Sequence, residues 1–345
     1  MIHRVSQVPV IAADQVKPSH PRLKVAGIFN PAACFYQDQI FLLARVAEIC
    51  NSPRDKIHVP VAVSNSGKIN ILEWPQEEAD SSDSRIIKVH GKTYLSSLSH
   101  LRLARSSDGI RFTVDTEPFI FPQSPDENYG VEDARITKIR DTFYITYTAV
   151  SENGFGVALA STRDFKTLTR HGMILPPQNK DACLFPSKIN GKYMILHRPL
   201  VEFLGTPSIW IAESPDLLRW GNHHFLMAAR GNQWEIGKIG AGPEPIKTDE
   251  GWLLLYHAVD KNEKYTLHLA LLDLRNPQKI LKRTSQPILK PELNWEREGF
   301  YAEVVFSNGW VAFPDGRVLI YYGGADSAIG AAESSIRELL GFLNR

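Results

Sequence analysis

The sequence has 345 residues, of which 43% are hydrophobic, 22% charged and 10% aromatic, as is typical of a globular protein rather than a disordered or fibrous one. Its 39 Lys and Arg residues balance 38 Asp and Glu residues without a basic tract, which argues against nucleic-acid binding. No membrane-span-length apolar stretch or signal peptide is evident, and three widely spaced cysteines suggest neither disulfides nor a zinc cluster. We therefore expect a cytoplasmic protein without a bound metal.

One pattern recurs along the chain: a polar turn leads into a short run rich in Tyr, Phe, Ile and Leu. Runs of this kind, opened by turns such as Asn-Gly or Asp-Gly, predict strands that follow hairpin turns. The five copies occupy residues 37–48, 140–150, 190–200, 249–259 and 315–325. A second element, a strand closed by a Ser-x-Asp-type turn, occurs at residues 102–112, 158–168 and 210–220. Clear helical periodicity is confined to the C-terminus, in SSIRELLGFLNR.

These repeats predict an all-β fold, a five-bladed β-propeller with a short C-terminal helix. Strand-rich units that recur along a chain fit radial repetition better than a sandwich. A two-domain α/β enzyme is the main alternative, and the absence of alternating helical segments counts against it. We expect one domain over residues 1–345, with an N-terminal extension at about 1–25 and the helix at about 332–344.

Polar residues stand where the repeated strands end. In a propeller, corresponding strands would line one central funnel, which is the default ligand site of such a fold. The residues that would then converge are Arg45, Thr148, Arg198, His257 and Asp326. For any one of them, a polar residue that merely ends its own strand is the simpler explanation, but five at equivalent positions favour a shared site.

The segment YGVEDARIT, residues 129–137, precedes the second repeated strand and would lie at the rim of this funnel. The like charge of Glu132 raises the pKa of its neighbour Asp133, whereas Arg135, on the same face of an extended chain, lowers it. A carboxyl group tuned in this way can act as a general acid or base. An Asp–Arg pair that closes a turn explains the segment equally well. Glu244, Glu303 and Asp326 are further candidate carboxylates.

Several cations and aromatic rings belong to the same strand ends and loops. Cations grouped around one funnel favour an anionic ligand, of which phosphate is the commonest small one. These cations are Arg45, Arg198, Lys238 and His257. No P-loop or GxGxxG spacing supports nucleotide binding. The rings that we expect to stack on a ligand belong to Tyr129, Trp234, Tyr265 and Tyr301.

Together these residues resemble glycoside hydrolase family 130, the β-mannoside phosphorylases and related hydrolases, which are five-bladed propellers. The resemblance spans about residues 27–328, and its most specific motifs are GVEDARIT and KIGAGPEPIKTDEGWLLLYHAV. Further matches are GIFNPAA, FLLARV, SHLRLARSSDG, KDACLFPSKINGKYMILHRP, LALLDLRNP and YYGGAD.

The resemblance implies an inverting phosphorylase that cleaves β-mannosides, such as mannooligosaccharides, and yields α-mannose 1-phosphate. Asp133 would be the only proton donor and act through a hydroxyl of the bound mannose, while inorganic phosphate would be the co-substrate and no cofactor would be needed. The implied phosphate pocket is Arg198, Lys238, His257 and Tyr265, and the implied mannose subsite is Asn30, Arg45 and Asp326. The remaining candidate substrate-binding residues are Glu132, Arg135, Asp181, Glu244 and Glu303.

Two departures from the family pattern leave other functions open. Glu244 replaces a Pro usual in phosphorylases and Glu303 an Asn, so either could activate water as the base of an inverting β-mannosidase. A non-catalytic sugar-binding propeller is the alternative from another class. Residues 47–94 form a longer excursion than in compact members, and we expect it to reshape the acceptor side. Family members are often oligomers, so a homo-oligomer is a further expectation.

Overall fold

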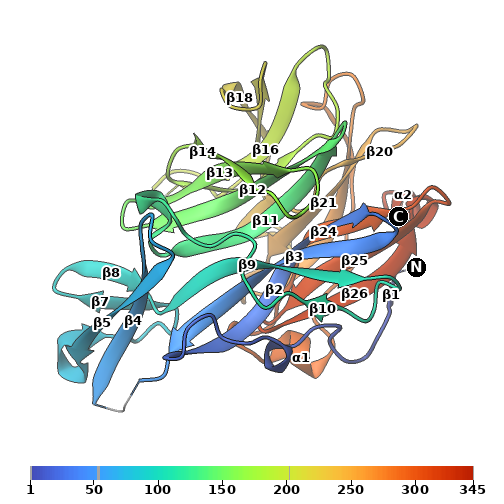
Figure 1. The fold of residues 1–345 in the computed structure, drawn as a ribbon. Coiled ribbons are helices and arrows are strands. Elements are labelled where there is room, and N and C mark those ends of the chain that lie inside the picture. The colour runs from blue at the N-terminus through green and yellow to red at the C-terminus, as the bar shows by residue number, and fades with distance from the viewer. Residues whose placement is uncertain (1, 53–54, 202, 345) are drawn as a thin grey trace.

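Strands dominate the computed structural model, which describes residues 2–52, 55–201 and 203–344 (Figure 1). The predicted all-β class is therefore confirmed, and each of the five repeated segments contains a long strand. Within the described ranges, no helix is both long enough and apolar enough to cross a bilayer.

Most strands of the described chain can be divided into five antiparallel groups of four, and a parallel pairing of Gly130 with Ser99 joins the first two groups into one eight-stranded sheet. Group one contains β2 (Leu23–Tyr36), β3 (Gln39–Cys50), β9 (Ser97–Ser106) and β10 (Thr113–Val114). Group two contains β11 (Gly130–Ile139), β12 (Thr142–Ser151), β13 (Gly154–Thr162) and β14 (Thr169–Leu175). Group three contains β15 (Asn179–Leu184), β16 (Tyr193–Pro199), β17 (Ile209–Ser214) and β18 (Gly221–Met227).

The last two groups are built in the same way. Group four contains β19 (Lys238–Ala241), β21 (Trp252–Val259), β22 (Tyr265–Leu272) and β23 (Ile280–Arg283), and the short β20 (Ile246–Lys247) also pairs with β21. Group five contains β24 (Val305–Ala312), β25 (Arg317–Gly324), β26 (Ala328–Ser335) and β1 (His3–Arg4). The N-terminal segment thus supplies the outer strand of the last group.

Hydrophobic clusters join the groups in a fixed order. One cluster is shared by groups one and two, the next by two and three, and so on to groups four and five, and another joins group five back to group one. Strand β21 shows how the sequence supports this packing: Leu254 belongs to the cluster with group three, whereas Leu253 and Leu255 belong to the cluster with group five. Because side chains alternate along a strand, a strand buried on both faces has a continuous apolar run.

The connections explain how the repeated strands begin and where the helices lie. The turn before β16 contains Asn190 and Gly191 with φ of 50° and 80°, the left-handed pair that tight hairpins require. Helix α2 (Ile336–Phe342) begins after Ser335, whose Oγ accepts a hydrogen bond from the Glu338 backbone N–H at 3.2 Å. The predicted helix start near residue 332 is wrong, because residues 332–335 extend β26. A four-residue helix α1 (Asn294–Arg297) and three 3₁₀ turns, Ala13–Gln15, Gln76–Glu78 and Pro125–Glu127, complete the helical segments described.

The excursion between β3 and β9 folds into a separate small unit beside group one and group two (Figure 1). It contains a hairpin of β4 (Lys56–Val63) and β5 (Lys68–Pro75) and a sheet of β6 (Ala79–Asp80), β7 (Ile86–Val89) and β8 (Lys92–Leu95). Its apolar cluster is centred on Val59, Ile87 and Val89.

Candidate active site

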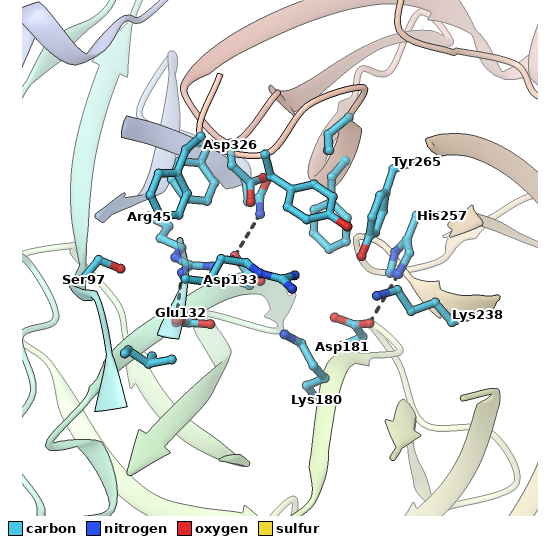
Figure 2. A pocket seen from close by; sticks show the side chains of 18 of the residues that line it. Arg45, Ser97, Glu132, Asp133, Lys180, Asp181, Lys238, His257, Tyr265 and Asp326 are labelled. Carbon is cyan, nitrogen blue, oxygen red and sulfur yellow. Dashed lines mark hydrogen bonds and ion pairs between the residues drawn. The ribbon is translucent and has the colours of Figure 1, made fainter. Parts of the chain in front are cut away.

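A cavity of about 270 Å³ lies where the five groups meet, and each group contributes to its wall (Figure 2). Its polar lining is Asn30, Arg45, Arg85, Ser97, Glu132, Asp133, Lys180, Asp181, Arg198, Lys238, His257, Tyr265, Tyr301 and Asp326. Its apolar lining is Phe29, Leu95, Phe300, Val304 and Phe306. The predicted convergence of strand ends is thus observed for four of the five residues proposed from the repeats; the fifth, Thr148, is buried in β12 without lining the cavity.

Three of the cavity side chains come from β-bulges at matching places in β2, β11 and β15. In each strand, the pairing with the next strand accommodates one extra residue. The residues at these bulges are Asn30, Asp133 and Asp181, with φ of 49°, 49° and 52°. Asn and Asp tolerate this left-handed region better than most residues, and a bulge changes the direction in which a side chain points. The local geometry thus explains why an amide and two carboxylates recur here.

One side of the cavity, which we call the carboxylate side, contains Asn30, Arg45, Glu132, Asp133 and Asp326. The Asp133 carboxylate accepts a hydrogen bond from Asn30 Nδ2 at 3.0 Å and a longer one from Arg45 Nη1 at 3.4 Å. Arg45 also donates from Nη2 to Glu132 at 2.8 Å and from Nε to the Ser99 hydroxyl at 2.9 Å. Arg45 is therefore fixed by three partners and bridges the two adjacent carboxylates.

The two Asp residues on this side have different acidities. Burial alone would raise the pKa of Asp133, but the charges of Arg45 and Lys180 and the hydrogen bond from Asn30 lower it below its ordinary value. Burial raises the pKa of Asp326 to about 7; Arg45 opposes this rise, and the charges of Asp133 and Glu132 support it. At neutral pH, Asp133 is therefore ionised and Asp326 is partly protonated.

The opposite side, which we call the cation pocket, contains Lys180, Lys238, His257 and Tyr265 (Figure 2). Arg198 also belongs to it, since it lines the cavity and bonds to Asp181. Burial lowers the pKa of Lys238 to about 8, and the charges of Arg198 and Lys180 act in the same direction. Burial lowers the pKa of His257 to about 3, so its imidazole is neutral and can donate one ring N–H. Mutual repulsion among these cations would be relieved by a bound anion.

Asp181 binds or contacts side chains of the cation pocket and of the wall behind it. Its carboxylate accepts hydrogen bonds from Arg198 Nε at 2.7 Å and Arg135 Nη2 at 3.2 Å, and His257 Nε2 lies 3.4 Å away. Burial alone would raise the pKa of Asp181, but these guanidinium groups hold it well below its ordinary value. Gly240 leaves the necessary room, because a Cβ at this position would overlap both the Asp181 carboxylate and the His257 ring.

Three predicted substrate-binding residues do not line the cavity. Arg135 is buried behind its wall, where it donates to the backbone carbonyls of Asp133 at 2.7 Å and Ala241 at 3.0 Å. Glu244 has one buried carboxyl oxygen that finds no hydrogen-bond partner among the residues the structure describes, and burial raises the pKa of this carboxyl well above its ordinary value. Glu303 forms an ion pair with Lys264 at 2.8 Å. Of these three, Arg135 supports the site directly by fixing the Asp133 and Asp181 bulges.

The aromatic predictions divide in the same way. Tyr265 and Tyr301 line the cavity, and their rings contact each other edge to face at a centroid distance of 6.0 Å. Tyr129 instead contacts Tyr94 of the excursion, and Trp234 donates its indole N–H to Gln286 at a separate surface hollow.

Sequence reasoning missed several residues of the cavity wall. Two of them, Phe29 and Lys180, directly precede a bulge residue, as does the predicted Glu132, and all three line the cavity. The segments FNPAA, EDARI and KDACL share one pattern: a bulky or charged residue, then Asn or Asp, then Pro or Ala. Aligning them places Lys180 at the same position as Glu132, so the sequence does contain a signal for Lys180. Arg85 lies in the excursion, where no repeat marks it. The other missed lining residues are Leu95, Ser97, Phe300, Val304 and Phe306.

Comparison with known proteins connects this cavity to a family. The model of glycoside hydrolase family 130, described as beta-1,4-mannooligosaccharide phosphorylase, matches residues 83–345. A beta-1,2-mannobiose phosphorylase from Listeria innocua is 41% identical, with 98% of this chain and 97% of that protein covered. A beta-1,4-mannooligosaccharide phosphorylase from Ruminococcus albus is 31% identical, covering 84% of this chain and 88% of the relative.

A solved structure extends the similarity to three dimensions. The beta-1,2-mannobiose phosphorylase from Listeria innocua, in complex with beta-1,2-mannobiose, superposes with a TM-score of 0.95 at 40% identity, and the match covers 99% of both chains. The fold and the cavity described above therefore lie within a chain that matches this structure over nearly its whole length.

Proposed function

Because the chain belongs to glycoside hydrolase family 130, we propose that it is an inverting phosphorylase that cleaves β-mannosides with inorganic phosphate and releases α-mannose 1-phosphate. The observation that carries this proposal is the division of one cavity into a carboxylate side with Asp133 and a cation pocket whose carboxylate, Asp181, is bound by Arg198 and Arg135. We further propose β-1,2-mannobiose as the substrate, in line with the function named for the Listeria innocua relative.

The proposed reaction uses the two sides of the cavity together. A phosphate oxygen attacks the anomeric carbon of the mannosyl unit from the face opposite the leaving oxygen, and the bond from that carbon to the leaving oxygen breaks. The leaving oxygen takes a proton that Asp133 supplies through a hydroxyl of the mannose. Since phosphate is already an anion, it needs no general base, and the cation pocket binds it by charge-assisted hydrogen bonds. One displacement converts the β-linkage into an α-linkage.

Phosphate binding also prepares Asp133 for its role. The charges of Arg45 and Lys180 lower the pKa of Asp133, which suits a base better than an acid. A phosphate beside Lys180 offsets that positive charge and brings negative charge of its own, and both effects raise the pKa of a neighbouring carboxyl group. Phosphate is thus both the nucleophile and the partner that favours protonated Asp133.

The hydrolase alternative requires a carboxylate base that faces the substrate, and the two candidates lie elsewhere. Glu244 is outside the cavity lining, and burial raises the pKa of its carboxyl well above the ordinary value, which disfavours the ionised form that a base needs. Glu303 is held by Lys264. An inverting glycosidase needs both an acid and an ionised base that flank the scissile bond. This placement supports phosphorolysis over hydrolysis.

We propose that the five strand groups are the blades of one β-propeller domain that spans the chain. The cyclic order of the shared hydrophobic clusters and the pairing of β1 with β26 support closure of the ring between the last blade and the first. We place the reaction in the cytoplasm, where three free cysteines would stay reduced.

Two variants test the proposed roles. Asp133→Asn is expected to lower kcat by about 1,000-fold or more while binding of mannobiose changes little. Asp141→Asn, the same change at an exposed residue of the turn between β11 and β12, should leave kcat unchanged. Arg198→Ala is expected to raise the KM for phosphate at least about tenfold, with exposed Arg219→Ala as its control. Full activity of Asp133→Asn would exclude Asp133 as the proton donor.

A further inference from the structure

Arg85 is the cavity residue whose role the proposed reaction leaves open. It lies in the excursion, just before β7, and its side chain is 51% exposed, so it lines the open part of the cavity rather than its floor. The Asp83 carboxylate accepts hydrogen bonds from Arg85 Nε at 3.0 Å and Nη2 at 2.8 Å. The Arg85 backbone carbonyl accepts a bond from the Ser96 N–H at 3.0 Å. Both ends of the residue are therefore fixed.

The Arg85 guanidinium reaches a segment from the other end of the chain. It lies over the Tyr301 ring, with 5.1 Å between the guanidinium carbon and the ring centroid. The Tyr301 hydroxyl donates to Glu263 at 2.5 Å, and the Tyr301 ring also contacts Tyr265 of the cation pocket. The excursion is thus joined, across the cavity, to the segments that lead into β22 and β24.

The excursion holds Arg85 on a rigid support. Ile87 and Val89, which follow Arg85 in β7, are buried in the excursion's own apolar cluster. The excursion is also hydrogen-bonded to the body of the protein: the Ala62 N–H donates to the Asn128 carbonyl at 2.9 Å, and the Asn65 N–H to the Gln123 carbonyl at 2.7 Å. A side chain supported in this way can position a ligand group.

The charge environment of Arg85 differs from that of the cation pocket. Arg85 already has a bidentate carboxylate partner, so a second anion would gain little from its charge. Its remaining N–H groups have no hydrogen-bond partner in the described part of the chain, and a guanidinium presents five donors in a planar fork. Neutral hydroxyl groups with adjacent oxygens match such a fork. Lys180 and Lys238, by contrast, line the cavity without an ion pair to any carboxylate of the described residues, and they suit phosphate.

We propose that Arg85 is a binding residue for the leaving sugar, donating hydrogen bonds to its hydroxyl groups while Tyr301 supports the guanidinium from behind. This inference rests on the proposed function, because it assumes that mannose occupies the carboxylate side and phosphate the cation pocket, which leaves the open part of the cavity for the leaving sugar. It assigns to the excursion a direct role in acceptor recognition.

The reverse reaction, in which the enzyme synthesises the β-mannoside, tests sugar binding by Arg85 separately. In that direction the leaving sugar is a substrate of its own, the acceptor. With α-mannose 1-phosphate as donor and mannose as acceptor, Arg85→Ala is expected to raise the KM for mannose about 10-fold to 100-fold, the loss typical of hydrogen bonds to a charged group. The KM for phosphate in the degradative direction should stay within about twofold of the wild-type value. Lys88→Ala, which removes an exposed cation of β7 three residues after Arg85, is the matched control and should change neither constant.

Binding measurements keep this test separate from the proposed function. In the Asp133→Asn background, Arg85→Ala is expected to weaken calorimetric binding of β-1,2-mannobiose about tenfold or more, and this result would support the sugar contact even if wild-type enzyme formed no mannose 1-phosphate. Unchanged binding and unchanged KM for mannose would overturn the assignment. A raised KM for phosphate with an unchanged KM for mannose would also overturn it and place Arg85 with the phosphate ligands. Equal thermal unfolding midpoints for the variants exclude misfolding as the cause.

Discussion

Asp326 offers a test of the cavity's electrostatics that does not depend on any substrate. Burial raises the pKa of its carboxyl to about 7, against an ordinary value of 3.8. Between about pH 4 and pH 7 the folded protein therefore binds a proton at this site that the unfolded chain has released. The free energy of unfolding then falls as the pH rises through this window, by up to about 1.4 kcal/mol per pH unit.

Asp326→Asn removes the titration with little change of shape. Asp326 has a φ of 50°, and Asn tolerates this left-handed backbone as well as Asp does. Two pH units within the window correspond to about 2.7 kcal/mol, and partial exposure of the residue reduces this to about 2 kcal/mol. The variant should therefore gain about 2 kcal/mol over the wild type between pH 5 and pH 7, while it loses activity because a substrate-binding carboxylate is gone.

Thermal unfolding of both proteins at pH 5 and pH 7 measures this gain. For 345 residues, about 2 kcal/mol corresponds to a shift of the unfolding midpoint of roughly 3 °C. The unfolding midpoint of the variant minus that of the wild type should be larger by this amount at pH 7 than at pH 5. If the difference between the two proteins is the same at both pH values, Asp326 does not titrate in this window and the account of the carboxylate side is wrong.

Two further predictions concern the cation pocket and the alternative base. Gly240→Ala places a methyl group against the Asp181 carboxylate and the His257 imidazole, so kcat/KM for phosphate should fall about 100-fold. Gly237→Ala is its control and should retain activity, because the added methyl group meets only Val259, at 3.8 Å. Glu244→Gln and Glu303→Gln should each keep kcat within about twofold of the wild type, because neither carboxylate lines the cavity. A steady-state assay decides both, and loss of turnover in either Gln variant would restore the hydrolase hypothesis.

The sequence allowed the strand repeats to be recognised because turn residues and apolar runs are local signals. The same repeats indicated that Arg45, Arg198 and His257 converge, since equivalent strands meet at equivalent places. The bulges were not recognised, because an extra residue in one strand becomes visible only against its pairing partner. The Arg85 position could not be predicted for a different reason: it depends on how the excursion packs against the body, which no local pattern records.

The positions of Glu244 and Glu303 show the limit of reading charge from sequence. Both occur close to motifs that do line the cavity, since Lys238 precedes Glu244 and Val304 follows Glu303. In a strand or an adjoining loop, a shift of one residue is enough to turn a side chain to another face. Chain position alone therefore indicated three additional substrate contacts, including Arg135, that the folded cavity does not use as lining.

The phosphate dependence of product formation tests the central claim most directly. Purified protein is incubated with β-1,2-mannobiose in the presence and absence of inorganic phosphate, and mannose 1-phosphate and free mannose are measured together. The cavity as described predicts equal amounts of mannose 1-phosphate and mannose with phosphate present, and no cleavage without it. Release of two mannose molecules per disaccharide at the same rate without phosphate would contradict the proposal and make water the nucleophile.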